Sequence, residues 1–228
     1  MSLVRFLILA TIGLAPHGNA SGQTPCPPLD TTAVWARVSR AWSDETSPRW
    51  ANDSLRAVLL GLRDRDQGPR AEFSARASDP DYARRLLRLD SALSAELEAI
   101  LDRFGLPTRS MVGATGSDAA MLIVQHSASL QERVLALGKA LPAGEISPEK
   151  LAMLEDRVLV HQGKPQRFGT QFNLGSDGVF RFAPVADAPG LEARRSAAGM
   201  MPMSQYVCMF EEAGMQIDRA SLPPGLRR

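Results

Sequence analysis

Residues 147–172 constrain the fold of this chain more than any other stretch. Ser147 suits a helix N-cap, Pro148 suits the first helical turn, and Gly163 suits the position just after a helix, so a helix is predicted between them. At about 100° per residue, apolar residues fall on nearly every side of that helix. Because a helix of this kind is usually buried, we expect it at the centre of a helical fold.

Three charged residues, Glu155, Asp156 and Arg157, lie in the middle of this expected helix. Neighbouring positions do not face each other on a helix, so Asp156 and Arg157 should each meet a different partner. A buried charge without a partner costs several kcal/mol, which is comparable to the stability of a whole domain. The sequence therefore predicts a buried polar site whose other members come from elsewhere in the chain.

Residues 1–20 are typical of an export signal peptide. Arg5 supplies a positive charge, residues 6–15 form a short apolar core, and residues 18–20 are small enough for a cleavage site. The apolar run is too short to span a bilayer comfortably, so we expect no stable membrane span after cleavage, with an uncleaved signal anchor as the alternative. We expect a periplasmic or secreted protein that begins with an extended arm over residues 21–30.

The chain has 228 residues, and about 200 remain without the signal, which suits one well-packed domain. The full chain has 26 Lys and Arg against 25 Asp and Glu, and residues 1–20 contain one Arg and no acid, so the mature chain is near neutral. A general nucleic-acid binder needs an excess of basic residues, so we expect no nucleic-acid partner.

The chain has two cysteines, Cys26 and Cys208, near opposite ends. In an exported protein such a pair predicts a disulfide between the N-terminal arm and the last helix, with two free buried thiols as the alternative. No CxxC motif or Cys/His cluster indicates a metal, so we predict neither a metal nor a cofactor.

Most of the chain has the periodicity of amphipathic helices. Apolar residues spaced by three and four predict helices over 31–42, from 48 or 50 onward, over 79–104, 130–142, 191–198 and 204–212. Residues 119–124 are continuously apolar, so for residues 118–126 a buried helix capped by Ser117 and a central strand both fit. Alternation around the turn at 175–178 predicts a β-hairpin near 166–183. We therefore expect a mainly α protein, a helical bundle-like single domain over residues 31–215, with a mobile tail over 216–228.

One predicted helix carries charges where its apolar face should continue. Its apolar stripe reaches Leu62, and steps of four residues then reach Asp66 and Arg70. This spacing places an acid and a base at positions that face the core. Gly68 and Pro69 could break the helix between them, and a frayed, solvated helix end is the alternative.

Several short motifs spread along the chain form one pattern. They are Asp66-Gln67 with Arg70, Gln125-His126 with Gln131, Asp156-Arg157, Gly163 with Gln166-x-Phe168-Gly169-Thr170-Gln171, Arg194-Arg195, Gly199 and Tyr206. With these motifs the chain resembles the bacterial domain-of-unknown-function family 6624 over about residues 62–206. The family commonly has Tyr at the position of Phe168, and Pro69 is a departure from it. The resemblance implies a polar site and no named activity.

His126 is the natural acid–base group of the predicted site, because imidazole can exchange protons near neutral pH. The predicted catalytic residues are His126, Asp156 and Asp66. Arginine forks bind carboxylate or phosphate with two hydrogen bonds, which favours a small anionic ligand. The predicted ligand-binding residues are Arg70, Gln125, Arg157, Gln166, Thr170, Gln171, Arg194 and Arg195.

Two classes of function fit this site. In the first, the protein is an exported hydrolase or lyase that acts on a small anionic substrate. In the second, it is a non-catalytic periplasmic binding or interaction module, and the polar cluster is a structural network. A metal site of two carboxylates and one histidine is a weaker alternative, because the spacing is not diagnostic. The sequence leaves open whether the protein is an enzyme.

Overall fold

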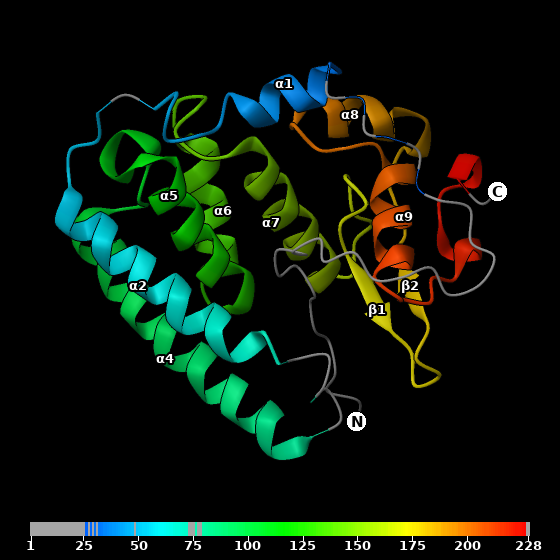
Figure 1. Cartoon of the computed structure of the whole chain (residues 1–228), viewed down its shortest axis with the longest axis horizontal. Coiled ribbons are helices and arrows are strands. Elements are labelled where there is room, and N and C mark those ends of the chain that lie inside the picture. Colours follow the sequence, from blue (N-terminus) through cyan, green and yellow to red (C-terminus); the bar gives the residue numbers. More distant parts are fainter. Residues whose placement is uncertain are drawn as a thin grey trace. The chain divides into compact units, whose positions relative to one another are not determined.

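The computed structural model describes Cys26, Pro28, Asp30 and residues 32–47, 49–72, 76 and 79–226. The predicted signal peptide and most of the predicted arm lie outside these residues. The chain divides into two compact units, and each is described here by itself: unit 2 is Arg40–Leu154, and unit 1 is formed by the described residues on either side of it (Figure 1). The single-domain prediction stays a prediction.

The described residues are mainly helical and include one two-stranded antiparallel sheet, which confirms the predicted fold class. No helix among them combines the length and the apolar character needed to cross a membrane.

Unit 2 is built from helices. Its elements are α2 (Asp53–Arg70), α4 (Pro80–Phe104), α5 (Arg109–His126), α6 (Gln131–Ala140) and the first turns of α7 (Pro148–His161). Figure 1 shows α2 lying along α4, and α2 also packs against α5. Leu59, Leu62, Leu93 and Leu97 are buried, so the predicted apolar stripes of the two long helices form the core between them.

Capping residues decide where the long helices begin. The Asn52 side chain accepts a hydrogen bond from Leu55 N at 2.9 Å, so α2 starts at Asp53 and not at the predicted 48 or 50. The helix does not break at Gly68-Pro69, the alternative that the sequence left open, because α2 continues to Arg70. Pro69 lies in the last turn, where its missing N–H removes a single bond.

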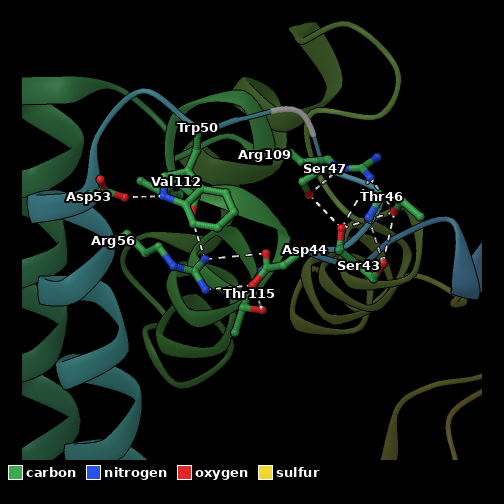
Figure 2. A network of polar contacts seen from close by, with 10 residues as sticks. All are labelled: Ser43, Asp44, Thr46, Ser47, Trp50, Asp53, Arg56, Arg109, Val112 and Thr115. Carbon is green, nitrogen blue, oxygen red and sulfur yellow. Dashed lines mark hydrogen bonds and ion pairs between the residues drawn. The ribbon is translucent and has the colours of Figure 1, made fainter.

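Helix α5 contains a kink that the sequence pattern did not show. Gly113 has φ 74° and ψ 169°, so a turn separates two helical segments, and Ser117, the predicted cap, lies inside the second of them. The strand alternative for residues 118–126 is wrong. Figure 2 shows the reason for the kink: Arg56 Nη1 donates to Val112 O at 2.8 Å, and the Asp44 carboxylate accepts from Thr115 N at 3.0 Å. These side chains satisfy main-chain groups that the kink removes from the helix.

Unit 1 combines short helices with the hairpin. It contains α1 (Val34–Arg40, whose last residue belongs to unit 2), the last turns of α7, β1 (Phe172–Leu174), β2 (Phe180–Phe182), α8 (Leu191–Ala197) and α9 (Met203–Glu212). In addition, 3-10 turns occur at Ala188–Gly190, Arg219–Ser221 and Pro224–Leu226. The hairpin and the last two helices match the prediction, whereas α1 is shorter than the predicted 31–42. A buried cluster forms the core: Phe182, Leu191, Met203, Val207, Phe210 and Leu222.

The C-terminal segment 216–222 packs against the hairpin, while the mobility of the predicted tail over 216–228 stays a prediction. Phe180 N donates to Gln216 O, and Asp218 N donates to Phe180 O, both at 2.8 Å. Leu222 belongs to the buried core. This segment therefore occupies the edge of β2 that β1 leaves unpaired.

The predicted disulfide between Cys26 and Cys208 is present, with the two Cα atoms 5.7 Å apart, so the alternative of two free thiols is wrong. Cys26 N also donates to Glu212 Oε1 at 3.0 Å. At Gly199, which has φ +74°, an added Cβ would lie 3.0 Å from Val38 Cγ1, so α1 packs closely on the turn that follows α8. The N-terminal segment thus contacts the C-terminal part of unit 1 at two places, the disulfide and the turn at Gly199.

Candidate functional site

The predicted site residues fall into two polar clusters, one in each unit. We call the first the Asp66 cluster; it contains Asp66, Arg70, Asp90 and His126 of unit 2. We call the second the Asp156 cluster; it contains Asp156, Gln166, Thr170, Gln171, Arg194 and Arg195 of unit 1.

The Asp66 cluster is centred on a shared guanidinium. Asp66 and Arg70 lie one turn apart on α2, and Arg70 Nε donates to Asp66 Oδ1 at 3.1 Å. Arg70 Nη2 also forms an ion pair with Asp90 Oδ1 on α4. The side chain of Asp66 is 1% exposed and those of Arg70 and Asp90 are each 8% exposed. Two buried carboxylates therefore share one arginine.

His126, the last residue of α5, joins this cluster. Its Nε2 lies 3.8 Å from Asp66 Oδ2, and its side chain is 7% exposed. The same Asp66 oxygen accepts a hydrogen bond from Gln67 Nε2 at 2.6 Å. The structure thus brings together the predicted residues Asp66, Arg70 and His126, while their catalytic or binding roles stay predictions.

The sequence interpretation missed Asp90. The buried positions of α4 run Tyr82, Leu86, Asp90 and Leu93, so Asp90, next to the apolar Leu89, occupies a core-facing step of the helix. An acid at that spacing was the available signal. Burial raises the pKa of Asp90 to about 6; the positive charge of Arg70 opposes this rise and the negative charge of Asp66 adds to it.

A buried glutamine closes the end of α5 next to His126. Gln131 Nε2 donates to Val124 O at 3.3 Å and to Gln125 O at 3.2 Å, so it binds carbonyls that the helix end leaves unpaired. The next helix, α6, begins after Leu130 without a side-chain cap. The predicted ligand-binding Gln125 is buried in α5.

The Asp156 cluster holds a loop through main-chain hydrogen bonds. Asp156 is fully buried on α7. Its Oδ1 accepts from Arg167 N at 2.6 Å and Phe168 N at 2.9 Å, and its Oδ2 accepts from Thr170 N at 3.0 Å and Thr170 Oγ1 at 2.9 Å. Burial raises the pKa of Asp156, and these hydrogen bonds oppose the rise. The geometry makes Asp156 the anchor of the loop and gives its predicted catalytic role no support.

The predicted glutamines of this cluster bind the same loop. Gln166 Nε2 donates to Gln171 O at 2.9 Å and to Ala183 O at 2.8 Å, while its Oε1 accepts from Gln171 N at 2.8 Å. Gln171 Nε2 donates to Thr170 Oγ1 at 3.0 Å. Gln166 therefore connects the loop to Ala183, the residue that follows β2.

The two arginines of α8 bind protein groups as well. Arg195 Nη1 donates to Phe168 O at 2.6 Å and its Nε donates to Met201 O at 2.9 Å. Arg194 Nε donates to Arg167 O at 3.0 Å, and its Nη1 pairs with Asp187 at 2.5 Å. Both guanidinium groups thus fix the loop from its carbonyl side, opposite to Asp156.

Arg157 lies beside Asp156 on α7 and is buried. Burial lowers the pKa of Arg157 to about 9, and the Tyr206 phenol opposes this shift. Among the described residues, one group of three potential metal ligands has atoms within 4.8 Å of one another, namely Cys26, Cys208 and Glu212. The two sulfurs of that group form the disulfide, so it does not fit a metal site.

A third polar network, which the sequence did not indicate, holds residues 41–53 to the kink of α5 (Figure 2). Arg56 pairs with Asp44 at 2.7 Å and lies over the Trp50 ring at 4.4 Å. Burial alone would raise the pKa of Asp44, but hydrogen bonds from Thr115 and Arg56 outweigh it and lower the pKa. Arg109 donates to Ser47 Oγ at 2.9 Å. Each of these groups binds another protein group, so the network is structural.

These features define a mainly helical protein with a carboxylate–arginine–histidine cluster in one unit and an anchored loop in the other. The model of a family of unknown function (DUF6624) matches residues 53–218, and the chain belongs to that family. This confirms the resemblance over residues 62–206. No curated protein and no solved structure matches the chain significantly. The match includes both clusters but not Cys26, α1 or Asp44.

Proposed function

We propose that the protein is exported and that the Asp66 cluster is its functional site, where His126 acts as the acid–base group of a hydrolase or lyase reaction on a small molecule. The observation that carries this proposal is the 3.8 Å separation between His126 Nε2 and Asp66 Oδ2 in a largely buried setting. A carboxylate beside one imidazole nitrogen orients the ring and stabilises its protonated form, as a general base requires.

The charge content of the cluster supports function over scaffolding. Arg70 pairs with both Asp66 and Asp90, so one carboxylate lacks a cation of its own. Burying a surplus charge costs stability, and such groups are enriched at functional sites. A purely structural ion pair would need only one of the two acids.

The non-catalytic binding or interaction module is the second candidate, and the Asp156 cluster favours it. The Asp156 oxygens accept hydrogen bonds from four donors of the loop, and Arg194 and Arg195 bind carbonyl oxygens of the same loop. In this view the polar motifs of unit 1 form a structural network that holds the hairpin segment on α7. Such a network leaves these side chains no role in binding an anion.

The predicted anionic ligand gains little support from these arrangements. Arg70 faces two carboxylates, and Arg194 and Arg195 face carbonyl oxygens and Asp187. Arg157 belongs to unit 1, so this proposal gives it no role at the Asp66 cluster.

A comparison of His126→Gln with His161→Gln tests the site. His161 is an exposed histidine on α7 and serves as the matched control. If His126 is functional, His126→Gln should have an unchanged or higher free energy of unfolding in urea, because functional residues often lower the stability of a protein. The variant should also lose the thermal shift given by phosphate, citrate, butyrate or n-butylammonium, whichever stabilises wild type.

A structural His126 predicts the opposite result. His126→Gln would then lose about 2–3 kcal/mol, as expected when a buried polar partner is removed, and none of these compounds would stabilise either protein. That outcome would reject the catalytic proposal in favour of the second candidate.

Export is supported by the disulfide between Cys26 and Cys208, because disulfides persist mainly in oxidising compartments. Cell fractionation of the full chain with a C-terminal tag tests it, with a variant lacking residues 1–20 as the control. We expect the tagged chain outside the cytoplasm with its N-terminus near residue 21, and the truncated control inside. A full-length chain retained in the cytoplasm would refute the proposal.

A further inference from the structure

The formal charges of the Asp66 cluster do not balance. Asp66 and Asp90 each contribute −1, Arg70 contributes +1, and a neutral His126 contributes nothing. The cluster therefore carries a net negative charge in a setting where the acid and arginine side chains are at most 8% exposed. A buried excess charge of this kind favours the approach of a positive group.

Two side-chain oxygens, Asp90 Oδ2 and Gln131 Oε1, accept no hydrogen bond from the described residues. Within the described residues, Asp90 accepts hydrogen bonds only through Oδ1, from Arg70, so its Oδ2 has no donor. Gln131 Oε1, in a side chain that is 2% exposed overall, likewise meets no donor in the described part of the chain. Buried acceptors normally find a donor, so Gln131 Oε1 indicates a ligand that carries N–H groups. Asp90 Oδ2 is not among the fully buried unpaired atoms, so it remains accessible to such a ligand.

The end of α5 adds to the negative potential. His126 is the last residue of this helix, and the C-terminal end of a helix dipole is negative. The Gln131 amide uses its N–H donors on Val124 O and Gln125 O, the carbonyls just before His126. The part of Gln131 that remains for a ligand is its acceptor oxygen.

We propose that the Asp66 cluster binds a small organic cation, a primary ammonium or guanidinium group, with Asp90 as the principal charge partner. This inference rests on the proposed function of the same site and replaces the expected anion by a cation. Asp90 Oδ2 and Gln131 Oε1 accept the N–H donors of the ligand, while His126, held by Asp66, exchanges a proton with the substrate. Arg70 holds the two carboxylates in place and makes no contact with the ligand.

The test uses four probes of similar size: n-butylammonium, ethylguanidinium, butyrate and butanamide. Their binding to the mature chain is measured by calorimetry at constant ionic strength. The variant is Asp90→Asn, and the matched control is Glu96→Gln. Glu96 lies on the same helix and pairs with Arg65 at the surface, at 2.7 Å, so both substitutions change the net charge equally.

We expect the two cationic probes to bind wild type and Glu96→Gln equally, and to bind Asp90→Asn at least about tenfold more weakly, as the loss of one charge-assisted hydrogen bond requires. Circular dichroism verifies that Asp90→Asn is folded. A second measurement needs no variant: lowering the pH from about 7 to about 5 should weaken cation binding to wild type. Asp90, which faces Arg70 and Asp66, would then gain a proton.

Three results would overturn the inference. Equal cation binding by wild type and Asp90→Asn would assign the cation to another surface. Binding of butyrate in place of the cations, with loss in His126→Gln, would reject the cation and leave the proposed site standing. Failure of every cationic probe to bind would also reject it, and the stability of His126→Gln would then decide separately whether the proposed function fails.

Discussion

Replacing Asp156 by alanine removes the acceptor for four hydrogen-bond donors that hold residues 167–170 on α7. The donors are Arg167 N, Phe168 N, Thr170 N and Thr170 Oγ1. Phe168 and Thr170 are buried, so their N–H groups cannot turn to water without opening the loop. The substitution therefore tests whether Asp156 is an anchor.

The expected loss follows from those contacts. Each buried donor left without an acceptor costs about 1–3 kcal/mol, so the three donors of Phe168 and Thr170 together represent about 3–9 kcal/mol. Burial raises the pKa of Asp156, because the ionised carboxylate loses its hydration in the folded protein. Alanine removes this unfavourable desolvation, which offsets part of the loss. We therefore expect Asp156→Ala to lose about 3 kcal/mol and Asp156→Asn, which keeps one acceptor oxygen, about 2 kcal/mol.

Urea unfolding followed by far-UV circular dichroism measures the loss, and amide hydrogen exchange over residues 163–172 measures the loop. Glu155→Gln is the matched control, because Glu155 is the adjacent residue and pairs with the Arg167 side chain at 2.8 Å in a partly exposed contact. It should cost under about 1 kcal/mol. An Asp156→Ala protein within about 1 kcal/mol of wild type, with unchanged exchange of the Phe168 and Thr170 amides, would refute the anchoring role.

Three further predictions follow from the geometry. Gly113→Ala should lose at least about 2 kcal/mol in urea unfolding, because φ is +74° and the new Cβ would lie within 3 Å of other side-chain atoms, whereas Gly61→Ala, with no atom within 4 Å, should gain up to about 1 kcal/mol; equal effects would refute this. Cys26→Ser with Cys208→Ser should lose about 3–5 kcal/mol, since the bridge closes a loop of 182 residues, and no loss would contradict a stabilising role. The pKa of Asp90 in the folded protein, about 6, lies above its ordinary 3.8, so wild type should lose stability relative to Asp90→Asn as the pH rises from about 4 to about 7; the opposite slope would contradict burial as the cause.

Sequence periodicity predicted most of the helices because each buries one continuous face. The boundaries were less accurate, since they depend on which side chain satisfies the first free amides. Pro48 and Trp50 suggested an early start for α2, but Asn52 makes the capping bond to Leu55 N. The kink in α5 was missed because the side chains that stabilise it, Asp44 and Arg56, lie far from Gly113 in the sequence.

The sequence predicted several residues of the two clusters correctly but did not predict which groups they contact. The spacing from Leu62 to Asp66 and Arg70 correctly indicated core-facing charges. Asp90 was missed because Leu89 offered an apolar residue at an adjacent position. Arg194 and Arg195 illustrate the remaining gap, because a guanidinium that binds a carbonyl oxygen looks the same in sequence as one that awaits an anion.

By itself, the sequence determined that the protein is helical, that the Cys26–Cys208 pair was available for a disulfide, and that Asp156 needed a buried partner. These features follow from local periodicity, residue type and the cost of burying charge. Only the tertiary structure decided that the partner of Asp156 is a set of main-chain amides, and that Asp66 and Asp90 share Arg70. Main-chain donors carry no residue-specific signal, and a shared ion pair depends on how separate helices pack.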